Sequence, residues 1–507
     1  MQHPKSRQVA IIGAGPGGLV SARWLLQHGF EPILFEAGDR LGGQWNLCSA
    51  ASATWSGMRT NTSRVTSAFS DLDHGTDVAT YPRQDQMLAY LERYAARFDL
   101  LRCIRFGTRV ERLEAAEGGC WRLRSRSASR MHEESFSQVI VATGAQAVPL
   151  LPDIPGMANF TGALGIAHTA RYKGAEPYRG RSVLVAGCSI SALEIASDLA
   201  FGGANVTAAY RRQRYIVPKL IAGVPAEHML FHRAAALAGE ALPAEALADS
   251  LKAAVLRAGG APDQFGAPVP DANVFAAGIS QSQGFLPAVA EGRVTVRPWI
   301  DRIDGGTVRF TDGTVATPDA ILFGTGYGLS VPWLAPDIAR TLNYDGRGLD
   351  LHAHTFHPNL RGLAFVGLYN LVGPYLPVLE LQARWIAYTL AGLAPMPSPT
   401  QMAQGLAACR AMRQRGQQPV LHDLAVSLAR QIGAEPDLAR WPELERALLF
   451  GPLSPVSFRL QGPDHLNDAP TRTLAAAQAF GAIRGPEFTP EELRLRSLIG
   501  SREAAVA

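Results

Sequence analysis

A glycine-rich turn near the start of the chain has the residue types and spacing needed to hold a dinucleotide. After the apolar run Val9 to Ile12 comes a G-x-G-x-x-G pattern, Gly13-Ala14-Gly15-Pro16-Gly17-Gly18. In such a turn the first glycine permits a tight bend, the second lets the backbone approach a pyrophosphate, and the third lets a helix pack closely. The free N–H groups at the start of that helix favour the anion.

Glu36 decides which dinucleotide this first turn predicts. It ends the next apolar strand, 36 − 18 = 18 residues after Gly18. A carboxylate at this place accepts hydrogen bonds from ribose hydroxyls and repels a 2′-phosphate. The first turn therefore predicts FAD or NAD rather than NADP.

A second turn repeats the layout with small residues in place of two glycines. It reads G-x-S-x-x-A and consists of Gly187-Cys188-Ser189-Ile190-Ser191-Ala192. Arg211 and Arg212 follow the next apolar strand, where an arginine can hold a 2′-phosphate with two parallel hydrogen bonds. This turn predicts NADPH, so the two turns together indicate a resident flavin and a nicotinamide that reduces it.

Two βαβ units must position these turns, one over Gln8–Phe35 and one over Arg181–Tyr210. Between them the pattern predicts an amphipathic helix over Tyr81–Leu100 and strands over 104–141. Beyond them it predicts Ala-rich helices over 220–265, short strands over 292–313 with a hairpin turn at Asp312-Gly313, a connector over 395–420 and then further helices.

Composition excludes several classes of protein. Of the 507 residues 47% are hydrophobic, and the net charge is only 48 − 44 = +4, which favours neither nucleic acid nor an anionic membrane surface. The cysteines form no CxxC pair and predict neither a disulfide framework nor a zinc site: Cys48, Cys103, Cys120, Cys188 and Cys409. Residues 1–7 show no signal peptide, and no apolar run is long enough to span a membrane, so we expect a soluble cytoplasmic protein.

Further motifs, in order along nearly the whole chain, resemble those of the flavin-containing monooxygenases, the class B flavoprotein monooxygenases. Besides the two turns they are Gly42–Trp45, Arg59–Arg64, Ala142–Gly144, Phe323–Tyr327, Glu380–Trp385 and Phe450–Pro455. With the two βαβ units, this resemblance implies an α/β fold of two Rossmann-like domains and a helical C-terminal region. The FAD domain would be discontinuous, with its first part over 1–165 and its second part over 331–507. The NADPH domain would span 166–330, with a helical insertion over about 220–290.

The resemblance also implies roles for individual residues. Asn61 would be the catalytic residue, forming a hydrogen bond near the flavin and NADP⁺ that helps to hold the oxygenated intermediate. Gln44, Trp45 and Gln382 would lie near the flavin, Ser189 and Ser191 would contact NADP⁺, and Arg211 would bind its 2′-phosphate. Taken together, the residues predicted to bind the cofactors are Gly13, Gly15, Pro16, Gly17, Gly18, Glu36, Gln44, Trp45, Thr60, Asn61, Thr62, Val110, Ala142, Thr143, Gly187, Ser189, Ile190, Ser191, Arg211, Arg212 and Gln382, and no metal ligand is predicted.

The implied reaction is reduction of FAD by NADPH, addition of O₂ to give a flavin C4a-hydroperoxide, and transfer of one oxygen atom to an amine nitrogen or sulfide sulfur. The expected partners are a small-molecule substrate, O₂ and a second copy of the chain in a homodimer, with no nucleic acid and no membrane anchor. Alternatives are Baeyer–Villiger oxygenation of ketones, an uncoupled NADPH oxidase, and a redox sensor without turnover. A flavin disulfide reductase would need a cysteine pair, and Cys48 has no near partner.

The chain departs from the family pattern in two places. The family fingerprint fits Phe160, Gly162, His168 and Tyr172 only with two extra residues before His168, so a packing role for this histidine stands beside a functional one. Tyr172, where the Baeyer–Villiger enzymes have tryptophan, leans away from ketone oxygenation. Several relatives end in an apolar membrane tail, whereas 494–507 is polar.

Overall fold

The first of two parallel sheets carries the first glycine-rich turn. The computed structural model describes residues 7–49 and 52–506. The expectation that the chain has no signal peptide rests mainly on residues 1–6, which lie outside the described residues. The sheet has the order β22-β7-β1-β2-β3, with strands β1 (Gln8–Ile12), β2 (Glu31–Phe35), β3 (Ile104–Arg105), β7 (Gln138–Val141) and β22 (Leu363–Phe365). Because β22 follows β7 only after the whole second sheet, this domain is discontinuous in sequence, as expected.

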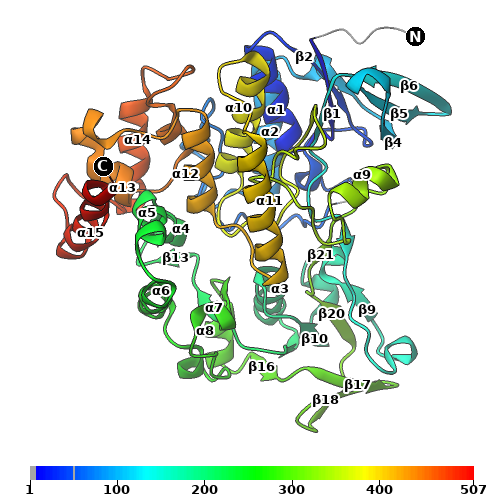
Figure 1. The fold of residues 1–507 in the computed structure, drawn as a ribbon. Coiled ribbons are helices and arrows are strands. Elements are labelled where there is room, and N and C mark those ends of the chain that lie inside the picture. Colours follow the sequence, from blue (N-terminus) through cyan, green and yellow to red (C-terminus); the bar gives the residue numbers. More distant parts are fainter. Residues whose placement is uncertain (1–6, 50–51, 507) are drawn as a thin grey trace.

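The second sheet repeats the plan around the second turn. Its order is β16-β11-β10-β20-β9, and every pairing in it is parallel. The strands are β9 (Gly165–His168), β10 (Ser182–Ala186), β11 (Asn205–Ala209), β16 (Val294–Arg297) and β20 (Ala320–Phe323). In Figure 1 the first sheet lies at the top and the second at the bottom of the molecule. The predicted class, α/β with two Rossmann-like domains, is confirmed.

Both predicted βαβ units are present, with the helix directly after the turn. Helix α1 (Pro16–Gln27) follows β1, and helix α3 (Ile190–Phe201) follows β10. The third glycine has the packing role expected of it, because a Cβ on Gly18 would lie 2.0 Å from the carbonyl oxygen of Gly13. Helix α1 packs against α10 (Leu376–Ala391), with Trp24 and Trp385 fully buried.

The other strands form smaller units beside the two sheets. One antiparallel sheet consists of β4 (Thr108–Ala115), β5 (Trp121–Ser127) and β6 (Arg130–Phe136), and another of β17 (Ile300–Asp304), β18 (Thr307–Phe310) and β19 (Val315–Ala316). The hairpin predicted at Asp312-Gly313 joins β18 to β19, where Gly313 has φ +83°. Short pairs link β8 (Val148–Pro149) to β21 (Tyr327–Gly328), β12 (Tyr215–Val217) to β15 (Ile279–Gln281), and β13 (Leu220–Ile221) to β14 (Val224–Pro225).

Helices make up most of the insertion and the C-terminal region. The predicted amphipathic helix is α2 (Gln84–Arg97). The insertion holds α4 (Ala226–Leu230), α5 (Arg233–Ala241), α6 (Ala244–Gly259), α7 (Val274–Ala277) and α8 (Phe285–Ala290). After α9 (Pro336–Thr341) and α10 come α11 (Pro399–Gln414), α12 (Leu421–Gln431), α13 (Glu445–Phe450), α14 (Ala469–Gln478) and α15 (Pro490–Val506). Helix α15 packs against α5, at the left of Figure 1.

The prediction of a connector over 395–420 is wrong, because most of this segment forms helix α11. Ser398 caps this helix by accepting a hydrogen bond from the backbone N–H of Gln401, whose side chain accepts one from Ser398 in return. Pro399 takes the first helical position, where the missing N–H costs no hydrogen bond. The proline that suggested a linker therefore starts a helix. In the described part of the chain, no helix has the length and apolar character needed to cross a membrane.

Candidate functional site

A cavity of about 2200 Å³ is lined by both glycine-rich turns and by the helical insertion. This is larger than the 300–1,000 Å³ or so of a single small-molecule pocket, so it has room for more than one ligand. Of the predicted residues, those that line it are Gly13, Gly15, Pro16, Gly17, Glu36, Gln44, Trp45, Thr60, Asn61, Thr62, Val110, Ala142, Thr143, Ser189, Ile190, Ser191 and Arg212. Gly18, Gly187, Arg211 and Gln382 are outside this lining.

The first turn forms a cradle that any side chain would fill. Gly13 has φ +102°, and a Cβ there would lie 2.8 Å from the carbonyl oxygen of Ala142. A Cβ on Gly43, which has φ +55°, would lie 3.1 Å from the Cα of Gly15. Two stretches of bare backbone thus meet at the N-terminus of α1, an arrangement suited to a pyrophosphate. The residues present therefore fit the pyrophosphate of FAD.

The Glu36 carboxylate is fixed at the rim of this cradle. One of its oxygens, Oε2, accepts a hydrogen bond of 2.8 Å from the backbone N–H of Ala14, and Oε1 accepts one of 2.8 Å from that of Gly38. Carboxylate oxygens have more than one acceptor site each, so both can still bind ribose hydroxyls. The position agrees with a free ribose and opposes a phosphorylated one.

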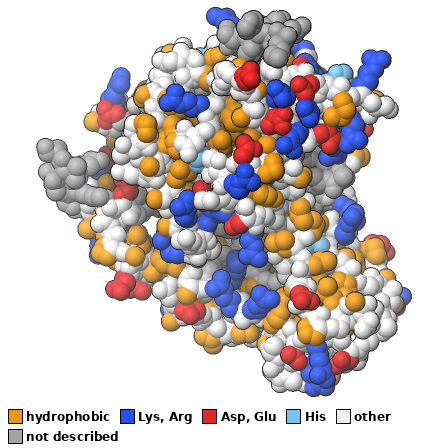
Figure 2. Space-filling view, turned by 45° about the vertical axis from the view of Figure 1, so that its right-hand side comes forward, with side chains coloured by type: hydrophobic (Ala, Val, Ile, Leu, Met, Phe, Trp, Pro, Cys, Tyr) orange, Lys and Arg blue, Asp and Glu red, His pale blue; other side chains and the backbone are white. Residues whose placement is uncertain are grey.

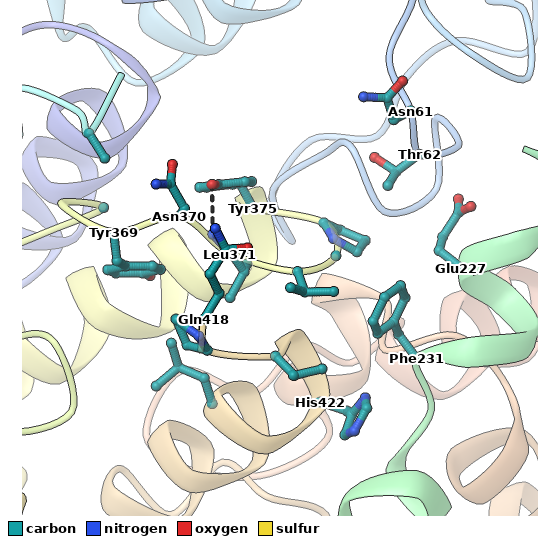
Figure 3. A pocket seen from close by; sticks show the side chains of 18 of the residues that line it. Asn61, Thr62, Glu227, Phe231, Tyr369, Asn370, Leu371, Tyr375, Gln418 and His422 are labelled. Atoms are coloured by element: carbon teal, nitrogen blue, oxygen red, sulfur yellow. Dashed lines mark hydrogen bonds between the residues drawn. The ribbon is translucent and has the colours of Figure 1, made fainter. Parts of the chain in front are cut away.

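Asn61 lies on a segment that is braced by its neighbours. The Thr60 hydroxyl donates to the carbonyl of Thr62 at 2.7 Å, and the Thr62 hydroxyl is 2.8 Å from that of Ser67. The Asn61 amide itself forms no hydrogen bond with the described residues, and it lines the cavity. Figure 3 shows it beside Thr62 at one wall, facing the cavity. Its donor and acceptor are therefore available to a ligand.

The second turn is as tightly packed as the first. Gly187 has φ +136°, and a Cβ there would lie 2.5 Å from the carbonyl oxygen of Gly324. Conversely, a Cβ on Gly324 would lie 2.6 Å from the Cβ of Ala192. The alanine at the third position of this turn therefore fits only because residue 324 is a glycine. Ser189, Ile190 and Ser191 start α3 and line the cavity.

Three arginines gather after β11 without acidic partners. The Arg211 guanidinium lies over the Trp299 ring, 4.6 Å from its centroid, and outside the cavity lining. Arg212 lines the cavity and donates to the carbonyl of Ala276 at 2.7 Å. Arg214, which sequence reasoning missed, lines it too, and burial lowers the pKa of its guanidinium. Among the described residues none of the three forms a salt bridge, so the group offers uncompensated positive charge. Figure 2 shows Lys and Arg side chains around the hollow above the lower lobe.

Gln382 lies under the cavity rather than in it. Its side chain is fully buried, and both ends of its amide are hydrogen-bonded to protein groups. The amide oxygen accepts from the backbone N–H of Gly367 at 3.2 Å and the Tyr369 hydroxyl at 2.8 Å. The amide nitrogen donates to the Thr355 hydroxyl at 2.8 Å. Gln382 thus holds Gly367 and Tyr369, both of which line the cavity.

The structure favours a packing role for His168. Its Nδ1 accepts a hydrogen bond of 3.1 Å from the backbone N–H of Ala170, and its ring meets the Tyr327 ring edge-on at 4.9 Å. The side chain is buried, which lowers its pKa. Tyr172, four positions on, is also buried, and its hydroxyl donates to Asp198.

Sequence reasoning missed two ionisable side chains of the cavity wall, Glu227 and His228 on α4. The backbone N–H of Ser63 donates to Glu227 Oε1, and the Ser63 hydroxyl is 2.9 Å from His228 Nε2. Both side chains are about 1% exposed. The only local signal was an acid beside a histidine in an otherwise apolar stretch, Val224–Leu230.

Acidification is expected to destabilise the fold through His228. Burial lowers its pKa to about 3. Because the same residue titrates near 6.5 in an unfolded chain, the unfolded state binds more protons as the pH falls from about 6.5 to 3, and stability is lost over that window. One pKa unit corresponds to about 1.4 kcal/mol, so about that much is lost by pH 5.5 or so. Thermal unfolding at about pH 7.5 and 5.5 measures the loss, which should be smaller in His228→Asn. Equal losses in the two proteins would contradict the assignment.

Most of the chain matches a known family. A family described as flavin-binding monooxygenase-like matches residues 6–480. The chain is 29% identical over 498 residues to dimethylaniline monooxygenase (N-oxide-forming) 2 of Rattus norvegicus, with 93% of this chain and 92% of that protein covered. It is 28% identical over 485 residues to flavin-containing monooxygenase 2 of Homo sapiens, with 90% and 89% covered.

Solved structures agree on the fold. S-allyl-L-cysteine S-oxygenase of Allium sativum superposes with a TM-score of 0.62 at 22% identity, covering 98% of this chain and 99% of that one. Closed cyclohexanone monooxygenase gives a TM-score of 0.62 at 18% identity, covering 83% and 96%. Because the family match spans nearly the whole sequence, this chain belongs to the flavin-binding monooxygenases and is an oxidoreductase that uses FAD and NADPH.

Proposed function

We propose that this protein inserts one oxygen atom from O₂ into a soft nucleophile, an amine nitrogen or a sulfide sulfur. The observation that carries the proposal is the Asn61 amide, which faces the cavity between the two dinucleotide turns without a partner among the described residues. Bound FAD, once reduced, activates O₂ and supplies an electrophilic oxygen. A substrate then needs only a lone pair on nitrogen or sulfur.

The role of Asn61 is to donate a hydrogen bond at the reacting oxygen. Oxygen transfer competes with loss of the oxygen as hydrogen peroxide, so the chain must slow that loss. An amide donor on a braced segment costs no reorganisation when the reaction occurs. Each 1.4 kcal/mol or so of stabilisation extends the lifetime of the reactive state about tenfold.

The arginines after β11 would hold the 2′-phosphate of NADPH. Arg212 and Arg214 line the cavity, whereas Arg211 is stacked on Trp299 beside it. The Arg214 guanidinium is partly buried without a carboxylate partner, which is costly, and a phosphate would compensate it. We assign the main contact to Arg212, whose exposed guanidinium lines the cavity, with a supporting contact from Arg214 and a smaller contribution from Arg211.

Product analysis tests the proposal. The purified holoenzyme is given NADPH and O₂ with a tertiary amine, a thioether or a ketone, and oxygenated product is compared with NADPH consumed. We expect N-oxide or sulfoxide in nearly one-to-one yield. Peroxide as the only product, or an ester from the ketone with no N-oxide or sulfoxide, would refute the assignment.

A further inference from the structure

Glu227 is a buried carboxyl group at the wall of the reaction cavity. It lies on α4, in the helical insertion, with 1% of its surface exposed. Figure 3 shows it beside Asn61 and Thr62, across the cavity from Asn370 and Tyr375. The insertion thus brings an acid to the same wall as the proposed catalytic amide.

The two oxygens of this carboxyl group are used unequally. Oε1 accepts hydrogen bonds from the backbone N–H of Ser63 and, at 3.3 Å, from the Thr66 hydroxyl. Oε2 is buried and has no partner among the described residues. A buried acceptor without a partner is unfavourable, more so when it is charged, and a ligand that carries a donor would remove this cost.

Four ionisable side chains from the segments around Glu227 are already engaged. His228 Nε2 is 3.9 Å from Oε1 but is hydrogen-bonded to Ser63, and burial keeps the ring neutral by lowering its pKa to about 3. The Tyr81 hydroxyl donates to the carbonyl of Lys219, and the Lys219 ammonium pairs with Glu194 at 2.6 Å. The Arg64 guanidinium donates to the carbonyl of Val78 and lies 5.1 Å from the Phe480 ring centroid. A cation entering the cavity would therefore find an acceptor without a competitor.

We infer that Glu227 is the substrate-binding carboxylate of this enzyme: Oε2 binds the ammonium group of a protonated amine and accepts its N–H proton. This inference rests on the proposed function. In the transfer the N–H bond breaks, an O–H bond forms on Glu227, and the electron pair stays on nitrogen as the lone pair that oxygenation requires. The substrate class is an aliphatic or benzylic amine that is a cation at neutral pH, with its hydrocarbon part against Phe231 and Leu371.

The electrostatics of the site agree with proton transfer. Burial raises the pKa of Glu227 above the ordinary value of a glutamic acid. A carboxylate with a raised pKa is a stronger base than one at the surface, and so takes a proton from an ammonium group more readily. Below that pKa the group is neutral and no longer attracts the cation.

A binding experiment tests the charge recognition without turnover. The holoenzyme is titrated in a calorimeter with benzyltrimethylammonium, a permanent cation that cannot be oxygenated, and with benzyl methyl sulfide, which is neutral. Glu227→Gln should weaken binding of the cation about tenfold or more, because the probe loses its attraction to an opposite charge in a largely enclosed site. The Kd for the sulfide should change less than about twofold. Glu245→Gln, which removes an exposed carboxylate from α6 of the same insertion, is the matched control and should change neither Kd.

One further variant, compared with Glu227→Gln, separates recognition from a structural role. Glu227→Gln keeps an acceptor for the Ser63 N–H, so the Asn61 segment should stay in place. Thr66→Val removes a hydrogen bond to Oε1 but leaves the carboxylate, and should affect the two probes equally. Equal weakening of both probes in Glu227→Gln would show that Glu227 only braces the segment and would overturn the inference. An unchanged Kd for the cation would overturn it as well.

The pH profile gives an independent readout with N,N-dimethylbenzylamine. The wild type uses the ammonium form, so its kcat/KM should be level between the pKa of Glu227 and that of the amine. Glu227→Gln can use only the unprotonated amine, whose fraction rises about tenfold per pH unit below the pKa of the amine. Its kcat/KM should therefore rise about tenfold per pH unit over the same range. Parallel profiles would overturn the inference while sulfoxide formation still supported the proposed function. If neither amine nor sulfide is oxygenated, the proposed function fails, and calorimetry still decides whether Glu227 binds cations.

Discussion

Replacing Asn61 with alanine is expected to leave FAD bound and to remove coupled oxygenation. On our assignment the glycine cradle and Glu36 would hold the dinucleotide, and their hydrogen bonds and packing do not involve the Asn61 side chain. Loss of one preorganised donor at a reacting oxygen typically costs a factor of about 10²–10³. The yield of N-oxide or sulfoxide per NADPH should therefore fall at least about 100-fold. NADPH consumption should continue, with its electrons recovered as hydrogen peroxide.

Asn370 provides the matched control for this variant. It also presents an amide to the cavity, but from the opposite wall (Figure 3). Asn370→Ala should retain most of the coupling, because its amide lies across the cavity from the proposed catalytic amide. Unchanged product yield in Asn61→Ala would refute the role of Asn61, and equal loss in the two variants would show that the cavity needs both amides.

The arginines after β11 are expected to separate NADPH from NADH. The double variant Arg212→Ala, Arg214→Ala should raise the KM for NADPH about 100-fold, because two charge-assisted contacts to the 2′-phosphate are lost. The KM for NADH should change less than about threefold, since NADH has no phosphate there. Arg211→Ala alone should have a smaller effect on NADPH, because its guanidinium is stacked on Trp299.

Steady-state kinetics with both cofactors measure this effect. Arg293→Ala is a suitable control, because Arg293 is exposed and pairs with Glu291 at the far end of β16 from the turn. Similar increases for NADPH and NADH in the double variant would remove the phosphate assignment. A large, NADPH-specific effect in Arg211→Ala alone would move the main contact to that residue.

The parts of the fold that follow from local rules could be predicted from the sequence. The turns at Gly13 and Gly187 were predictable because only glycine adopts their positive φ at no steric cost, and the pattern of strand, turn and helix is contiguous. Helix α11 was missed although its signals are equally local. Ser398, Pro399 and Gln401 form a capping box with an N1 proline, and the composition of the segment hid it.

The parts of the site that depend on distant contacts could not be predicted. Glu227 acquires its role only because α4 lies against Ser63, 227 − 63 = 164 residues earlier in the chain. Gln382 belongs to a recognisable motif, but the sequence does not reveal that its amide is saturated by contacts that support the cavity from below. Likewise, the sequence does not reveal that Arg212 and Arg214 line the cavity while Arg211 stacks on Trp299, a residue of another segment.

The central claim is that the two turns bring FAD and NADPH together around Asn61, and anaerobic reduction tests it most directly. The purified protein is incubated with FAD, and unbound FAD is removed. The protein is then mixed with NADPH in the absence of O₂ while the visible absorbance of the bound flavin is followed. We predict a yellow protein whose flavin absorbance is bleached by one equivalent of NADPH. A protein that stays colourless after incubation with FAD, or a bound flavin that NADPH does not bleach, would contradict the claim.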